Sequence, residues 1–131
     1  MKECLGHLIE AERRGFASRI RFLLQHDGDA ALTSWDQIAV ARARNDCVAD
    51  TATLLRAFRD ERAASVVLVA SLQPADLARG GQHPQVGRLT IGEVVGEWVH
   101  DDRNHFKQLL TNVQSYAWRQ MGNAQKFSLP H

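Results

Sequence analysis

The sequence is short of the features that mark secreted, membrane and nucleic-acid-binding proteins. Only two of its 131 residues are cysteine, too few for a disulfide framework, and we expect both thiols to be buried and reduced. The formal net charge of +1 gives no support for binding to nucleic acid or to a membrane surface. No apolar run reaches the length of a membrane span, and no segment has the pattern of a signal peptide. These absences predict a cytoplasmic protein.

The motifs of several enzyme classes are also missing. No glycine-rich phosphate-binding loop follows a strand-like segment, and no nucleophile-elbow pattern occurs. The chain has no internal repeat and no segment of low complexity. With 131 residues, of which 44% are hydrophobic, we expect a single domain over residues 1–131 with enough apolar side chains for a core.

What the chain does contain is helical periodicity, which predicts an all-α, antiparallel helical bundle. Apolar residues recur at helical spacing in three long stretches, residues 2–25, 46–72 and 91–118. Ser34 and Gln37 could cap a further, short helical segment that ends at about Arg44. Pro74 cannot continue the second helix, and Thr90 with Glu93 forms the capping-box pattern that begins the last one. Residues 26–34 and 73–89 are predicted to be loops, and no segment resembles a strand.

The last predicted helix offers a pair of candidate metal ligands, Asp101 and His105. Residues four apart on a helix differ by about 40° in rotation and about 6 Å in rise. Their side chains can therefore reach one ion, as they do in metal-binding helical bundles. His100 is the more obvious partner by residue type, but it falls among solvated positions on the other side of the helix. The spacing therefore favours Asp101 as the partner of His105.

Four charged residues fall within the apolar faces of the predicted helices: Glu12, Arg19, Arg62 and Asp102. An unpaired buried charge is very costly, so we expect these residues to pair across helices. Asp102 or Glu12 could instead act as a general base. A third role for Asp102 is to accept the second N–H of a metal-bound histidine.

Two segments resemble the DinB-like (DinB/YfiT-type) family of metal-dependent enzymes. CLGHLIEAERRGF at 4–16 is similar to the family's histidine-bearing helix. QHPQVGRLTIGEVVGEWVHDDRNHFKQLL at 82–110 is similar to its loop and its His-Asp-x-x-His helix. The resemblance spans roughly residues 2–118, and it implies a four-helix bundle with a divalent metal ion held by three side chains.

Carried onto this sequence, the resemblance implies that His7, Asp101 and His105 bind the metal. Asp101 stands where the family has its first helical histidine, which resembles the mycothiol-dependent branch, where a carboxylate occupies that position. Two histidines and a carboxylate suit zinc, nickel or another divalent ion with open coordination positions. The substitution could equally mark a site that has lost its metal. The remaining histidines are expected to be solvated: His26, His83, His100 and His131.

The family likeness implies a thiol-dependent transferase acting on a small electrophilic substrate, with a low-molecular-weight thiol as partner. The alternatives are a metal-dependent hydrolase and a non-catalytic dimeric bundle. The family's usual first helix has no counterpart ahead of the His7 helix. We therefore expect a homodimer in which the partner chain covers the bundle, unless residues 26–45 or the C-terminal tail cover it, or further protein precedes Met1. No nucleic-acid or membrane partner is expected.

Overall fold

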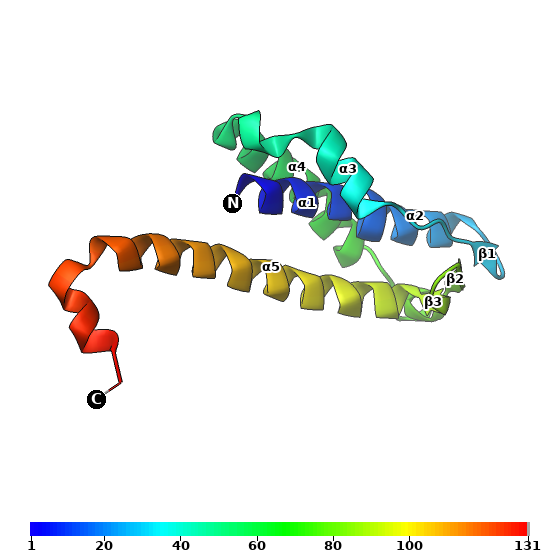
Figure 1. Ribbon diagram of the computed structural model, residues 1–131. Coiled ribbons are helices and arrows are strands. Elements are labelled where there is room, and N and C mark those ends of the chain that lie inside the picture. Colours follow the sequence, from blue (N-terminus) through cyan, green and yellow to red (C-terminus); the bar gives the residue numbers. More distant parts are fainter. Residues whose placement is uncertain (131) are drawn as a thin grey trace.

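The computed structural model describes residues 1–130 and is built mainly from helices (Figure 1). The α-helices are α1 (Lys2–Glu10), α2 (Ala17–Gln25), α3 (Gln37–Arg44), α4 (Thr51–Ala70) and α5 (Ile91–Gln120). A π-helical turn, η1 (Ala11–Phe16), joins α1 to α2, and three short 3₁₀ segments are η2 (Asp46–Val48), η3 (Pro74–Ala78) and η4 (Gly122–Ser128). The strands are β1 (Ala30–Ala31), β2 (Gly80–His83) and β3 (Gly87–Thr90). The expected all-α class is confirmed.

The rod formed by α1, η1 and α2 is the centre of the bundle. α4 packs along α1, whereas α5 lies against α1 and α2 and runs in the opposite direction (Figure 1). The predicted apolar face of the first helix is fully or almost fully buried: Leu5, Leu8, Ile9, Phe16, Ile20 and Leu23. Phe16 stacks on Trp98 of α5 with ring centroids 5.0 Å apart. This contact fixes α5 against the central rod.

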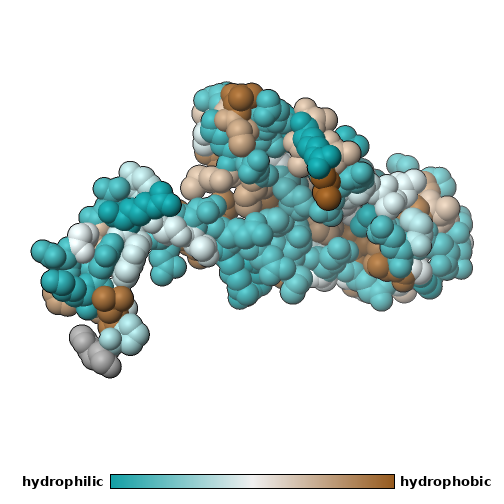
Figure 2. Space-filling view, viewed as in Figure 1, coloured by the Kyte–Doolittle hydropathy of each residue, from teal (hydrophilic) through white to brown (hydrophobic). Residues whose placement is uncertain are grey.

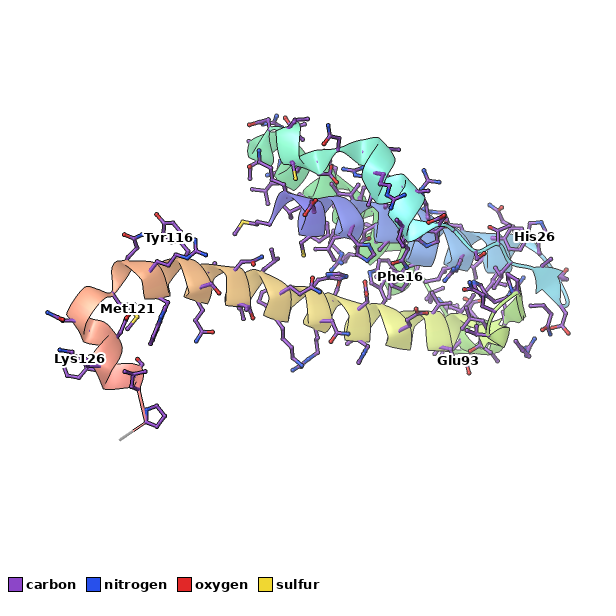
Figure 3. All side chains as sticks on the ribbon, in the orientation of Figure 1. Phe16, His26, Glu93, Tyr116, Met121 and Lys126 are labelled. Carbon is purple, nitrogen blue, oxygen red and sulfur yellow. The ribbon has the colours of Figure 1, made fainter. Side chains whose placement is uncertain are left out.

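α5 begins where the capping-box pattern predicts. The Glu93 N–H donates to Thr90 Oγ1 at 3.2 Å, and the Thr90 N–H donates to Glu93 Oε2 at 2.8 Å. The helix then runs for 30 residues, about 45 Å at the usual rise. Its far end and the tail stand clear of the bundle (Figure 2), and Tyr116 and Met121 lie on this projecting part (Figure 3). Only the first half of α5 therefore helps to build the core.

The prediction that the chain contains no strand is wrong. β2 and β3 form an antiparallel hairpin inside the predicted loop 73–89, and β1 pairs in parallel with β2. Strands of two to four residues are too short for apolar alternation to be visible in the sequence. Gly81 is required here, because a Cβ atom would lie 2.5 Å from the carbonyl oxygen of Ala30.

The π-helical turn changes the register of the central rod. A π turn closes hydrogen bonds from i to i+5 and so takes up about one more residue than an α turn. Residues after Phe16 are therefore rotated by about 100° relative to an unbroken α-helix. Glu12 and Arg19, seven residues apart, would share a face of an α-helix, but the π turn separates them.

Gly6 makes room for a buried acidic group at the N-terminal end of the bundle. Asp46 is buried, and Arg44 donates both to its carboxylate and to Glu10. A Cβ atom on Gly6 would lie only 1.7 Å from Asp46 Oδ2. The network can therefore form only where α1 has no side chain.

Replacing Gly6 with alanine is expected to lower the free energy of unfolding by about 1–3 kcal/mol, as overpacking of a well-filled site does. Gly96→Ala is the matched control, since no atom lies within 4 Å of a Cβ built there. In that exposed helical position alanine should stabilise by up to about 1 kcal/mol. Urea denaturation measures both changes. A Gly6→Ala variant more stable than the wild-type protein would contradict the packing described.

Two further expectations concern the surface. Within residues 1–130 no helix is both long and apolar enough to cross a membrane. Both cysteines are free thiols, as expected, but only Cys4 is partly buried and Cys47 is exposed. The expected burial of Cys47 is wrong, because η2 buries Asp46 and leaves Cys47 and Val48 exposed.

Candidate metal centre

Two helices bring His7, Asp101 and His105 together. His7 projects from α1, while Asp101 and His105 lie one turn apart on α5. One potential ligand atom from each residue can be chosen so that all three lie within 4.8 Å of one another. The rings of His7 and His105 have their centroids 4.5 Å apart. The packing of α5 on α1 thus gathers two imidazoles and one carboxylate.

The contact between His105 and Asp101 has the geometry of a pair that shares a cation. His105 Nδ1 lies 2.9 Å from Gln108 Oε1, an acceptor, so Nδ1 carries the proton and Nε2 presents a lone pair. That Nε2 faces Asp101 Oδ1 at 3.4 Å. Two ligands bound tetrahedrally to one zinc-sized ion would be about the same distance apart, about 3.4 Å. A cation between the two atoms would satisfy both.

A second observation on Asp101 agrees with a role as a metal ligand. Its Oδ2 atom is buried and has no hydrogen-bond partner within the described chain. A buried carboxylate oxygen without a partner is unusual in a folded protein. The residues present therefore fit a divalent ion, and Gln108 fills the supporting role of holding the second nitrogen of a ligating histidine.

His7 is suited to a role as a neutral ligand. Burial lowers the pKa of His7, and the nearby His105 lowers it further, against the opposing charge of Asp101. The neutral imidazole, which is the form that binds metal, therefore persists to a lower pH than in an ordinary histidine.

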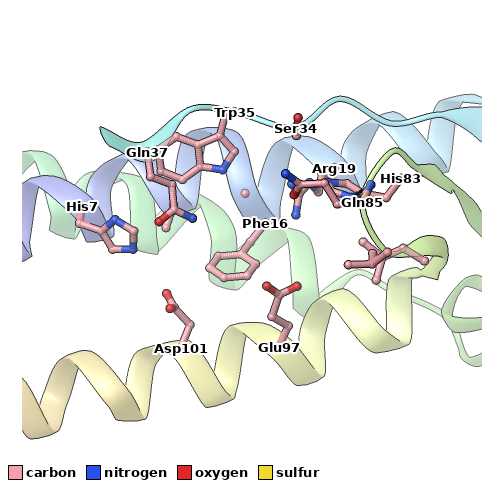
Figure 4. Close-up of a pocket in the computed structure, with 14 residues that line it drawn as sticks. His7, Phe16, Arg19, Ser34, Trp35, Gln37, His83, Gln85, Glu97 and Asp101 are labelled. Atoms are coloured by element: carbon pink, nitrogen blue, oxygen red, sulfur yellow. Dashed lines mark hydrogen bonds between the residues drawn. The ribbon is translucent and has the colours of Figure 1, made fainter. Parts of the chain in front are cut away.

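A small cavity opens beside these side chains. Its volume is about 170 Å³, and His7 and Asp101 line one end of it (Figure 4). A water molecule occupies about 30 Å³ in the liquid, so the cavity suits a small ligand. Trp35 forms a wall at the same end, with its ring stacked 6.0 Å from that of His7. The other lining residues include Phe16, Arg19, Ser34, His83, Gln85 and Glu97.

The remaining histidines and Cys4 lie where they do not complete this group. His26 and His100 are exposed, as expected, and His131 lies outside the described residues. His83 was expected to be solvated, but this residue lies at the end of β2 and is only 7% exposed. Cys4 Sγ is 3.6 Å from His105 Nδ1, the nitrogen that faces Gln108 rather than Asp101. Burial raises the pKa of the Cys4 thiol.

Pairing of the buried charges is confirmed for three of the four predicted residues. Arg62 donates to Glu12 Oε1 at 2.5 Å and to both carboxylate oxygens of Asp102 at 2.7 and 2.8 Å. Glu12 is 1% exposed and also accepts hydrogen bonds from Ser65 and Trp98. Asp102 is therefore committed to Arg62 and does not support a metal ligand.

The prediction that Arg19 forms an ion pair is wrong. It forms none in the part of the chain that the structure describes, where Arg62 is the partner of Glu12 and Asp102. The π turn rotates it away from Glu12. Arg19 lines the cavity instead, and its guanidinium contacts His83. Neither Arg19 nor His83 could be assigned to the cavity from the sequence, because the π turn and the short strand that place them leave no periodic signal.

Both the sequence and the fold of the chain are similar to those of known proteins. Residues 1–109 match the family model described as DinB superfamily, and no curated protein matches the sequence at a significant level. Among solved structures, YfiT from Bacillus subtilis is similar in fold, with 20% sequence identity and a TM-score of 0.70. The match covers 92% of this chain but 66% of that one. YfiT is described as a probable metal-dependent hydrolase with an unusual four-helix bundle topology.

Proposed function

The chain belongs to the DinB superfamily, and from this premise we propose that it is a metal-dependent enzyme whose divalent ion is held by His7, Asp101 and His105. The observation that carries the proposal is the convergence of two imidazoles and an otherwise unpaired carboxylate at one end of a small cavity. Zinc and nickel are the ions we propose, because this set of ligands suits both and leaves positions open for a substrate.

The reaction we propose is the transfer of a low-molecular-weight thiol to a small electrophilic substrate. A divalent ion bound here would lower the pKa of a coordinated thiol or water molecule, so that it reacts as an anion. Glu97 lines the same cavity one turn before Asp101. We assign to its carboxylate the role of accepting the proton that the nucleophile loses. Phe16 and Trp35 contribute apolar walls to the cavity.

Hydrolysis is the second candidate, and a specific feature of the site favours it. Two histidines and a carboxylate form the ligand set of several zinc hydrolases, and Glu97 could as readily accept a proton from water as from a thiol. YfiT, a protein of similar fold, is described as a probable metal-dependent hydrolase, which agrees with this candidate.

One assay with metal-loaded protein separates the candidates. The protein is given chlorodinitrobenzene with and without cysteine as the thiol, and in parallel p-nitrophenyl acetate without thiol. A thiol adduct that requires bound metal and Glu97 supports the transferase, whereas metal-dependent ester cleavage without thiol supports the hydrolase. If the protein binds metal but shows neither activity, a non-catalytic helical bundle is favoured over an enzyme acting on these classes of substrate. Failure to bind metal at all would overturn the proposal.

We further propose that two copies of the chain associate through the exposed apolar side chains of α5. Phe106, Leu110 and Val113 are all more than half exposed, and their spacing of four and three residues forms one stripe along the helix. A copy related by a two-fold axis would bury its own stripe against this one, and such symmetry is the commonest among homodimers.

A homodimer is therefore expected in light scattering at tens of micromolar protein, and Leu110→Glu should convert it to a monomer. Thr111→Glu, a charge introduced at the neighbouring exposed position, is the control and should leave the dimer intact. A monomeric wild-type protein at this concentration would show that the stripe does not mediate association.

A further inference from the structure

The end of the cavity away from the proposed metal ligands carries hydrogen-bond donors without acceptors. Figure 4 shows Arg19 and His83 together at that end, with His7 at the other and Asp101 and Glu97 across the cavity on α5. Arg19 comes from α2 and His83 from β2. Their only mutual contact joins Arg19 Nη2 to His83 Nε2 at 3.2 Å.

The protonation of His83 decides whether that contact is a hydrogen bond. Two donors approach the ring, the backbone N–H of Gln85 at 3.2 Å from Nδ1 and Arg19 Nη2 at 3.2 Å from Nε2. Burial and the charge of Arg19 both lower the pKa of His83, which keeps the ring neutral. The neutral ring has one acceptor nitrogen, so it can accept from Gln85 or from Arg19 but not from both, and when Nδ1 accepts from Gln85 the guanidinium faces Nε2–H with no acceptor between them.

Arg19 has further unused donor capacity. Its Nε atom is buried and has no hydrogen-bond partner among the described residues. Burial lowers the pKa of Arg19, and the negative charge of Glu97 opposes this effect by raising the pKa. Glu97 nevertheless lies beyond ion-pair distance, since no carboxylate of residues 1–130 comes within 4.0 Å of the guanidinium. Buried donors left unpaired in this way are costly.

We propose that Arg19 and His83 form a subsite for a carboxylate group carried by the substrate or by the thiol. A guanidinium presents parallel N–H donors that match the two oxygens of a carboxylate, and His83 Nε2 adds a third donor. The inference rests on the proposed function for the position of the reacting group. The ligand would span the cavity, with its carboxylate at Arg19 and its reacting atom near His7.

The balance of charge in the cavity agrees with a singly charged anion. A divalent ion and Arg19 would together exceed Asp101 and Glu97 by one positive charge, with the three histidines neutral. A monoanionic ligand would neutralise this excess. Without the metal ion the cavity has an excess of negative charge, so anion binding should be weaker but still directed to Arg19.

The test compares propionate with propionamide, which have nearly the same shape and differ in charge. Both are titrated into wild-type protein, with zinc bound and without it, while nuclear magnetic resonance follows the Arg19 Nε–H and His83 ring nitrogens. We expect saturable changes at both residues with propionate and none with propionamide. The metal-free titration reports on the subsite even if the metal proposal fails.

Variants of Arg19 and Arg21 test whether propionate binding depends on the position of the guanidinium or only on the total charge. Arg19→Gln is expected to weaken propionate binding at least tenfold, and Arg19→Lys to weaken it less. Arg21→Gln removes the same charge from an exposed position on the same helix and should leave binding unchanged. Equal binding of propionate and propionamide to wild type would overturn the proposal. So would an Arg19 signal that responds to Glu97→Gln but not to propionate.

Discussion

Replacing Asp101 with asparagine is expected to weaken metal binding by on the order of 100-fold or more, and to remove metal-dependent activity with it. Loss of an outer partner of a ligand typically costs 10–100-fold in affinity, and loss of a charged ligand should cost at least as much. Asparagine keeps the shape of the side chain but removes the charge that the two imidazoles cannot supply. Equilibrium dialysis with elemental analysis measures the effect.

Two histidines on the same helix provide a sharper control. His105→Ala should cause a loss comparable to that of Asp101→Asn, because His105 Nε2 faces Asp101 at 3.4 Å. His100→Ala is the same chemical change five residues earlier, at an exposed position, and should leave binding unchanged. Unaltered affinity in Asp101→Asn, or a loss in His100→Ala, would show that the metal is held elsewhere.

Replacing Arg62 with alanine is expected to lower the free energy of unfolding by up to about 3–5 kcal/mol, the usual cost of leaving a buried charge without its partner, because Glu12 is buried although the side chains of Arg62 and Asp102 are 30% and 34% exposed. Glu12 is 1% exposed and would be left with only the hydrogen bonds from Ser65 and Trp98. Asp102 would lose both of its bonds to the guanidinium. Denaturation by urea, followed by circular dichroism, measures the change.

Arg59→Ala is the matched control, since Arg59 lies on the same helix with its side chain 75% exposed. Its removal should change stability by less than about 0.5 kcal/mol. Adding Glu12→Gln to Arg62→Ala should recover part of the loss, because the buried charge is then gone. An Arg62→Ala variant as stable as wild type would mean that the pair contributes nothing to the fold.

The helices could be predicted from the sequence because their apolar spacing follows directly from burial of one face. The capping box at Thr90 and Glu93 gave the first turn of α5, and the rotation between His100, Asp101 and His105 identified which side chains face α1. His7 had no such local signal. It could be assigned only through the family resemblance, since a single histidine on a helix face is compatible with many roles.

The far end of the cavity could not be predicted, for two separate physical reasons. β2 is four residues long, so pairing with its neighbours rather than any apolar alternation determines where it lies, and with it the burial of His83. Arg19 was assigned to the charged cluster on the assumption of a uniform helix. Its position depends on the hydrogen-bond pattern of η1, which composition and periodicity do not reveal.

The π turn also bears on how this sequence should be compared with others. Residues 2–25 look like one helix that can be aligned without gaps, yet the turn accommodates about one residue more than an α-helix of the same length. A relative with an ordinary α-helix would share the orientation of His7 but would present its residue 18 where this chain presents Arg19. An alignment built on structure therefore needs a one-residue gap between His7 and Arg19, and any search for relatives with the same carboxylate subsite should allow for it.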